Sequence, residues 1–141
     1  MNKKDFAVGL ILNKYNEILL QKKDMGYPWF PGKWCFFGGE IEKGEIPKET
    51  LKRELEEELG YELKKVKLLG IQDYEDRYKK KYRKGKQHVF YHKYDGKISD
   101  ISLKEGAGFA FLSYDELNHF DIVSHDLKTI KKYYSKLEKV F

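Results

Sequence analysis

Four glutamates crowd one short segment of a chain whose net charge is +5: Glu54, Glu56, Glu57 and Glu58. In a helix each residue turns by about 100°, so Glu54 and Glu58 share one face with Glu57 beside them. Like charges at these spacings destabilise a helix by roughly a few tenths of a kcal/mol per pair. A divalent cation between the carboxylates removes this repulsion, and Mg²⁺ or Mn²⁺ favours such oxygen ligands. The alternative is a solvated acidic face with basic neighbours as counter-ions.

The segment that carries these glutamates, Pro47–Leu59, is predicted to be a helix. Its leucines form an apolar stripe at i, i+4 and i+8: Leu51, Leu55 and Leu59. Pro47 suits the first helical position and Gly60 suits the C-terminal end. Ile46 occupies the N-cap position, where Ser or Thr would stabilise the helix by about 1 kcal/mol. This helix must place the acidic strip at the edge of its buried face.

Apolar runs bounded by turn residues predict the strands that position this helix. They are Phe6–Leu12, Ile18–Gln21, Trp34–Phe37, Val66–Tyr74, Gln87–Gly96 and the first part of Gly108–Leu117. Asp24–Lys33 and the basic segment Lys79–Lys86 are predicted to be loops. Helical spacing of apolar residues predicts a second helix that begins near Ser124 and packs on the sheet: Leu127, Ile130, Tyr134, Leu137 and Phe141. Strands interleaved with helices favour an α/β layered domain.

Composition excludes several classes of protein. The 141 residues are enough for one domain with a core of its own. No apolar run approaches the ~20 residues of a membrane span, so no membrane partner is expected. The single cysteine, Cys35, rules out an internal disulfide, is compatible with the cytoplasm, and is expected to pack in the core. The basic balance suits an anionic partner, either a phosphate compound or a nucleic acid.

From Gly39 the chain reads G-x5-E-x7-R-E-L-x-E-E-x-G. The matched residues are Gly39, Glu45, Arg53, Glu54, Leu55, Glu57, Glu58 and Gly60. This pattern resembles the signature of the Nudix hydrolases, including their MutT-like members, at eight of nine fixed positions. Tyr61 stands where the family has Ile, Leu or Val, and Phe37 stands where Pro is common. The resemblance implies one Nudix domain over residues 1–141, folded as an α/β/α sandwich with a mixed central β-sheet.

The resemblance also implies a reaction, the hydrolysis of a diphosphate linkage in a nucleoside diphosphate derivative or a nucleoside triphosphate. Water attacks phosphorus with the help of Mg²⁺, or of Mn²⁺ in its place. The positions that match the family's metal ligands are the Gly39 carbonyl, Glu54, Glu57 and Glu58. Glu54 is also a candidate general base. Arg53 is expected to orient a carboxylate, and Glu45 to tie the preceding loop to the helix.

A further catalytic carboxylate is expected outside the signature. In MutT-type members a Glu-Gly pair precedes an aromatic residue of the next strand, with six residues from the Glu to the aromatic. Glu105, followed by Gly106, has this spacing to Phe111. Glu75 and Asp76 are the alternatives.

Substrate contacts are expected from basic and aromatic side chains near the glycines: Lys22, Lys23, Trp29 and Phe37. The aromatic residues of Asp24–Lys33 either line a pocket or plug the core. MutT-type enzymes that recognise oxidised guanine have an Asn near the C-terminus. Phe120–Asp126 has none, and either His125 or Asp126 is left to replace it.

Two other functions remain open at this point. The basic segment Arg77–Lys86, interleaved with Tyr78 and Tyr82, is suited to the 5′ end of an RNA, although a solvated hairpin tip is the commoner meaning of such a run. A non-catalytic nucleotide-sensing module would be expected to have lost carboxylates that are intact here. A small nucleotide is therefore the favoured partner over nucleic acid, and a homodimer is expected only by analogy with relatives.

Overall fold

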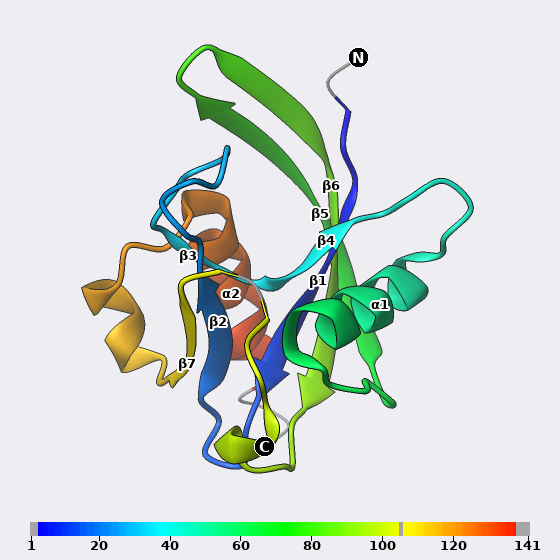
Figure 1. Ribbon diagram of the computed structural model, residues 1–141, viewed down its shortest axis with the longest axis vertical. Coiled ribbons are helices and arrows are strands. Elements are labelled where there is room, and N and C mark those ends of the chain that lie inside the picture. Colours follow the sequence, from blue (N-terminus) through cyan, green and yellow to red (C-terminus); the bar gives the residue numbers. More distant parts are fainter. Residues whose placement is uncertain (1–2, 105, 138–141) are drawn as a thin grey trace.

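The computed structural model describes residues 3–104 and 106–137, and Figure 1 shows a twisted sheet with one helix on each face. Its elements are β1 (Phe6–Leu12), β2 (Ile18–Lys22), β3 (Trp34–Cys35), β4 (Phe37–Glu40), α1 (Pro47–Leu59), β5 (Lys67–Tyr78), β6 (Lys81–Lys93), the 3₁₀ turn η1 (Ile98–Asp100), β7 (Gly108–Leu112), the 3₁₀ turn η2 (Asp115–His119) and α2 (Ser124–Leu137).

The strands of the described ranges form one seven-stranded mixed sheet in the order β3-β2-β1-β6-β5. Strand β4 pairs with β1, and β7 pairs with β2. The central pair β1 and β6 is parallel, whereas the neighbouring pairs are antiparallel. This α/β architecture with a mixed central sheet confirms the fold class that the sequence predicted.

Strand β1 supplies side chains to two separate cores because successive residues of a strand point to opposite faces. Ala7 and Ile11 pack in the cluster under α1. Val8, Leu10 and Leu12 pack in the cluster under α2. A strand covered on both faces is apolar at nearly every position, which explains the unbroken run in the sequence.

Helix α1 has the bounds that the sequence predicted. Its three leucines are completely buried or nearly so against the sheet. Gly60 ends the helix in the left-handed conformation, at φ 64°, and its N–H donates to the Glu56 carbonyl. Ile46 makes no side-chain cap hydrogen bond, as expected for an apolar N-cap. The helix therefore depends on burial more than on capping at its first turn.

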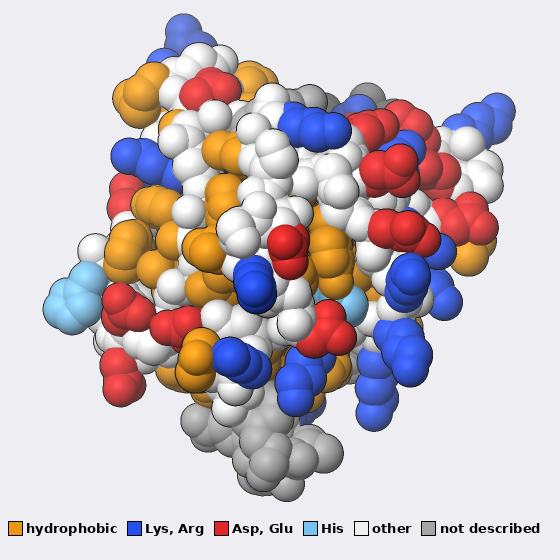
Figure 2. All heavy atoms as spheres, turned by 60° about the horizontal axis from the view of Figure 1, so that its bottom comes forward, with side chains coloured by type: hydrophobic (Ala, Val, Ile, Leu, Met, Phe, Trp, Pro, Cys, Tyr) orange, Lys and Arg blue, Asp and Glu red, His pale blue; other side chains and the backbone are white. Residues whose placement is uncertain are grey.

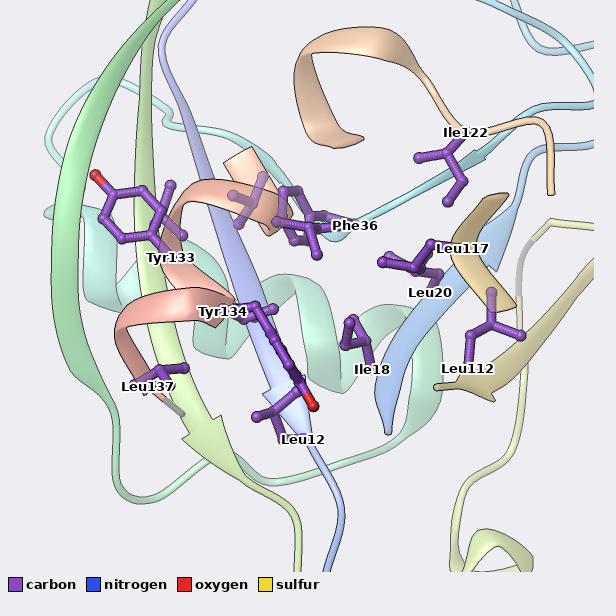
Figure 3. Close-up of a cluster of buried hydrophobic side chains, with 14 residues drawn as sticks. Leu12, Ile18, Leu20, Phe36, Leu112, Leu117, Ile122, Tyr133, Tyr134 and Leu137 are labelled. Atoms are coloured by element: carbon purple, nitrogen blue, oxygen red, sulfur yellow. The ribbon is translucent and has the colours of Figure 1, made fainter. Parts of the chain in front are cut away.

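Helix α2 covers the other face and buries Tyr133, Tyr134 and Leu137 in the core there. Figure 3 shows Tyr134 beside Leu12, whereas the hydroxyl end of Tyr133 points toward β5, where it contacts Gln72. Ile130 is also fully buried, which confirms most of the predicted stripe, while Leu127 is only partly buried. Phe141, the last residue of that stripe, lies outside the described residues. In the part of the chain described, neither helix has the length and apolar character needed to cross a membrane.

The prediction of a basic loop at Lys79–Lys86 was wrong. These residues continue β5 and β6 into a long hairpin, in which the turn consists of Lys79 and Lys80. The physical reason is pairing of opposite charges across the two strands: Asp73 lies 2.7 Å from Lys86, and Asp76 lies 2.9 Å from Arg83. The hairpin leans over the segment between β2 and β3, as Figure 1 shows.

The predicted strand Trp34–Phe37 is in fact two strands, because the chain continues extended through the glycines to Glu40. Gly38 lies opposite Val8 in the antiparallel pair with β1. It has φ 147°, and a Cβ at this position would lie 2.2 Å from the Ala7 carbonyl oxygen. Glycine is required here so that β4 can approach β1 closely enough to pair.

Candidate active site

A cavity of about 300 Å³ lies where the glycines of β4, the end of α1, the Asp24–Lys33 loop, the hairpin and the first turn of α2 meet. It is lined by Phe6, Val8, Lys23, Tyr27, Trp29, Phe30, Cys35, Phe36, Gly38, Gly39, Glu40, Glu54, Glu58, Tyr74, Asp76, Arg83, Gln87, Val123, His125 and Asp126. The segments that form this cavity are far apart in the sequence, and the sheet brings them together.

The acidic end of the cavity is made by two of the predicted carboxylates, Glu54 and Glu58. They lie four residues apart on α1 and therefore on one face. Glu58 is 4% exposed, and its Oε2 accepts a hydrogen bond of 3.1 Å from the Gln21 side chain. The same Gln21 amide donates to the Phe36 carbonyl at 3.0 Å. Strand β2 thus fixes the position of a nearly buried carboxylate at the cavity wall.

Gly39 allows the Glu54 carboxylate to lie directly against the backbone of β4. A Cβ built on Gly39 would be 2.3 Å from Cδ of Glu54 and 2.4 Å from its Oε1. Real Cβ atoms do not approach other atoms so closely, so any side chain at this position would displace the carboxylate. The chain therefore forms a cradle of backbone and carboxylate oxygen atoms that depends on glycine.

The Arg53 guanidinium binds the carboxylates around it. Its Nε lies 2.8 Å from Glu45, and its Nη1 lies 2.9 Å from Glu54 and 3.4 Å from Glu57. The hydrogen bonds from Arg53 and from the Glu42 backbone lower the pKa of Glu45 to about 2. Glu45 also accepts a hydrogen bond from the Thr50 hydroxyl, so it links the loop before α1 to the helix.

The charge of the acidic strip is therefore offset in this structure by an arginine, and in the described ranges no three acidic, histidine or cysteine side chains converge as a preformed metal cage. Arg53 bridges Glu54 and Glu57 instead. The donor set nevertheless fits a hard divalent cation, since it consists of carboxylate oxygens beside a glycine backbone. Glu54, Glu58 and Gly39 face the cavity, whereas Glu57 is 54% exposed and outside its lining.

Of the predicted substrate contacts, the structure brings Lys23 and Trp29 to the cavity. Lys22 is exposed and lies outside the lining. The prediction for Phe37 was wrong, because its side chain is completely buried in the core under α1. Phe36 points to the opposite face and lines the cavity in its place.

Cys35 also borders the cavity but is a packing residue, as predicted. Its side chain is buried, and burial raises the pKa of the thiol to about 12. The thiolate form is therefore scarce at neutral pH, and it is the thiolate that acts as a nucleophile.

The candidates for the further carboxylate are in different situations. Glu105 lies outside the described residues. The residues beside it contact the site, because the Lys104 N–H donates to the Glu58 carbonyl at 2.8 Å and the Ala107 N–H donates to the Lys22 carbonyl at 2.9 Å. Glu75 is exposed and absent from the cavity lining. Asp76 does line the cavity, but it is buried in ion pairs.

Four charged side chains from the hairpin and the first turn of α2 form a cluster that lines the cavity: Asp76, Arg83, His125 and Asp126. Asp76 lies 2.9 Å from Arg83 and 2.9 Å from His125 Nε2. His125 Nδ1 lies 3.0 Å from Asp126. Burial lowers the pKa of His125, but the hydrogen bonds and charges of Asp126 and Asp76 outweigh it and raise the pKa to about 9. His125 is thus an imidazolium at neutral pH.

Sequence reasoning missed this cluster as a unit. The available signal was the cross-strand pair of Asp76 and Arg83, which is visible only if the hairpin is extended through the basic run. Asp126 also accepts hydrogen bonds from Gln87 at 2.7 Å and from the Phe36 N–H at 3.2 Å. Four separate parts of the chain meet in these contacts, and no local pattern predicts them.

Aromatic side chains of the loop between β2 and β3 form a third wall. Trp29 packs under two cations of the hairpin, with the Arg83 guanidinium carbon 4.1 Å and the Lys81 Nζ 4.6 Å from its ring centre. Phe30 contacts Tyr78 edge to face at 5.4 Å. The loop therefore lines a pocket, which decides between the two interpretations that the sequence allowed.

Residues 3–133 match the NUDIX domain family. The chain belongs to this family. It is 30% identical over 108 residues to the nucleoside triphosphatase NudI of Escherichia coli O17:K52:H18, a match that covers 72% of this chain and 77% of that protein. Members of the Nudix family act on nucleoside diphosphate derivatives and generally depend on a divalent metal, so the protein is a Nudix pyrophosphohydrolase.

Solved structures share the fold. The MutT protein of Methanosarcina mazei Go1 aligns with a TM-score of 0.81 at 20% identity, covering 95% of this chain and 94% of that one. The NUDIX domain of NrtR from Shewanella oneidensis, in a cocrystal structure with ADP ribose, aligns with a TM-score of 0.78 at 13% identity, covering 97% and 90%. These likenesses confirm the architecture.

Proposed function

We propose that this Nudix enzyme hydrolyses nucleoside triphosphates with Mg²⁺ as its cofactor. The observation that carries the proposal is one cavity lined both by Glu54 and Glu58 of α1 and by Trp29 of the loop between β2 and β3. A nucleotide has the same polarity, with an anionic polyphosphate and an aromatic base. The likeness to a nucleoside triphosphatase supports this choice among the anhydrides that the family cleaves.

The chain would hold the cation through Glu54, Glu58 and the Gly39 backbone. Glu57, on the exposed side of α1, is a further candidate ligand. A bound divalent cation neutralises phosphate charge and acidifies water. Glu54 is our candidate for accepting the proton of the attacking water. Arg53 holds the Glu54 carboxylate at 2.9 Å and so fixes its orientation. Lys23, which also lines the cavity, would offset charge on the phosphates.

The test is a panel of nucleoside triphosphates, nucleotide sugars, dinucleoside polyphosphates and ADP-ribose, incubated with Mg²⁺ and scored for phosphate and pyrophosphate release. We expect the triphosphates to be cleaved fastest and Glu54→Gln to lower turnover by about 10²-fold or more. The same experiment with Glu49→Gln, in the exposed first turn of α1, controls for the loss of one helix carboxylate. Full activity of the Glu54 variant, or faster cleavage of another substrate class, would overturn the proposal.

The structure favours neither of the other functions. Two of the basic residues proposed to contact RNA are already engaged within the protein, because Lys81 and Arg83 pack on the Trp29 ring. The carboxylates that a non-catalytic sensing module would lack are all present in the signature.

A further inference from the structure

We infer that Arg83 selects the base, so that the enzyme prefers nucleobases with a carbonyl group over those with an amino group at the same edge. This inference rests on the proposed function, since it concerns the base end of the same cavity. It adds a residue and a substrate class that neither the signature nor the likeness to relatives supplies.

Arg83 is held in one orientation by contacts on three sides. Its Nε donates to Asp76 at 2.9 Å. Its guanidinium carbon lies 4.1 Å from the centre of the Trp29 ring and 4.9 Å from that of Phe6. A guanidinium fixed at Nε and stacked on aromatic rings is already ordered, so little side-chain entropy remains to be lost when a ligand binds.

In the charged cluster, the two basic side chains are more exposed to the cavity than the two carboxylates. The side chains of Arg83 and His125 are 18% and 23% exposed. Those of Asp76 and Asp126 are only 1% and 6% exposed. A ligand therefore meets hydrogen-bond donors first. Because two carboxylates offset the two cations, the cluster has no net charge, which suits a neutral acceptor such as a base carbonyl better than another phosphate.

Most donors of this cluster are already used inside the protein. His125 Nε2 lies 2.9 Å from Asp76, and the buried Nδ1 lies 3.0 Å from Asp126 without the geometry of a hydrogen bond, so neither nitrogen is available to a ligand. The Gln87 amide donates to Asp126 and its carbonyl accepts from Thr129. In contrast, within residues 3–104 and 106–137 no carbonyl or carboxylate accepts a hydrogen bond from the two terminal nitrogens of Arg83. Arg83 lines the cavity, so we take its terminal nitrogens as the donors that this cluster has left for a ligand.

Two parallel N–H donors match two adjacent acceptors. Guanine presents O6 and N7 as such a pair, whereas adenine replaces O6 by an amino group, which is itself a donor. Uracil and thymine differ from cytosine in the same way at position 4. A fixed guanidinium therefore favours the carbonyl bases. When an amino base binds, an N–H of Arg83 faces the amino group of the base, and two donors cannot form a hydrogen bond.

The first test changes the substrate and leaves the protein intact. We expect kcat/KM for GTP and for ITP, which both carry O6, to exceed that for ATP by about tenfold or more. The triphosphate of 2-aminopurine, which is guanine without O6, should be cleaved as poorly as ATP. Equal kcat/KM for GTP and 2-aminopurine triphosphate would overturn the inference while the proposed function stands. Failure to cleave any of these four, or UTP and CTP, would overturn both.

The second test changes the donor. Arg83→Lys keeps a cation beside Asp76 but loses the two parallel N–H donors of the guanidinium. We expect kcat/KM for GTP then to exceed that for ATP by no more than about threefold. Lys81→Met removes the other cation over Trp29 and should leave the ratio as in the parent. If the role of Arg83 were purely structural, its replacement would lower kcat/KM equally for GTP and ATP and leave their ratio unchanged. That result would refute the assignment, whatever the overall activity of the variant.

Discussion

Glycine at position 39 decides where the Glu54 carboxylate rests, because any Cβ there would overlap it at 2.3 Å. The overlap is with the end of a flexible side chain, which can move. Gly38 differs, since its Cβ would meet the Ala7 backbone oxygen at 2.2 Å and its φ is 147°. Two adjacent glycines therefore serve different purposes, one for the site and one for the sheet.

We expect Gly39→Ala to lower kcat/KM by about 10²-fold, because the displaced carboxylate no longer holds its position. Its unfolding midpoint in urea should stay close to that of the parent. Gly38→Ala is the comparison variant and should instead lose stability, since backbone atoms cannot yield. If Gly39→Ala kept full activity, or lost as much stability as Gly38→Ala, the assigned role of the cradle would be wrong.

Among the helices and strands, α1 carries the most functional side chains and begins with its weakest feature. Ile46 is exposed at the N-cap and has extended backbone angles of φ −91° and ψ 151°. These angles are the ones a capping residue adopts, so a hydroxyl there needs no backbone change.

Ile46→Ser is expected to raise the free energy of unfolding by about 1 kcal/mol, because its oxygen can accept from a first-turn N–H. Urea denaturation monitored by circular dichroism measures this change. Ile46→Ala removes the same apolar side chain without adding an acceptor, and it should give no such gain. A serine variant no more stable than the alanine variant would show that the first turn needs no cap.

The sequence predicted α1 to the residue because its signals are local: a proline at the start, a leucine stripe and a glycine at the end. It failed for the hairpin because a run of lysines and arginines has the composition of a loop, while the charges that stabilise it as a strand lie on β5. The metal site predicted at Gly39, Glu54, Glu57 and Glu58 stays a prediction, although Gly39, Glu54 and Glu58 do line the cavity. The counter-charge in the structure is Arg53, one of the basic neighbours that the sequence offered as counter-ions in the alternative of a solvated acidic face.

At the scale of the whole molecule, the buried charged cluster joins the hairpin to α2 and to the segment between β3 and β4. Its contacts run from Asp76 through His125 to Asp126 and then to the Phe36 N–H. Figure 2 shows how differently charge is arranged on one outer face, where acidic side chains gather on the α1 side with basic ones among them. Protonation of His125 in this interior cluster is coupled to folding.

The raised pKa of His125, about 9 against 6.5 ordinarily, makes stability depend on pH. The folded state holds this proton more tightly than the unfolded state, so the contribution is complete below about pH 6.5 and is lost as the pH rises through about 9. We expect the stability difference between the parent and His125→Gln to shrink by on the order of 2 kcal/mol between pH 6 and pH 10. Urea denaturation at each pH measures it.

His119→Gln controls for the loss of a histidine, because His119 is exposed on η2. Its stability curve should run parallel to that of the parent across the same range. A constant difference between the parent and His125→Gln would mean that the imidazole is not held in its charged form by Asp76 and Asp126.

The most direct test of the account is a titration with Mn²⁺, in which electron paramagnetic resonance counts the free ion. We predict that the parent binds the ion, that Glu58→Gln weakens binding by about tenfold or more, and that Glu56→Gln, on the exposed side of α1, binds as the parent does. Binding that is equal in the parent and the Glu58 variant, or that is lost equally in the Glu56 variant, would contradict the claim that the cavity-facing carboxylates of α1 hold the metal.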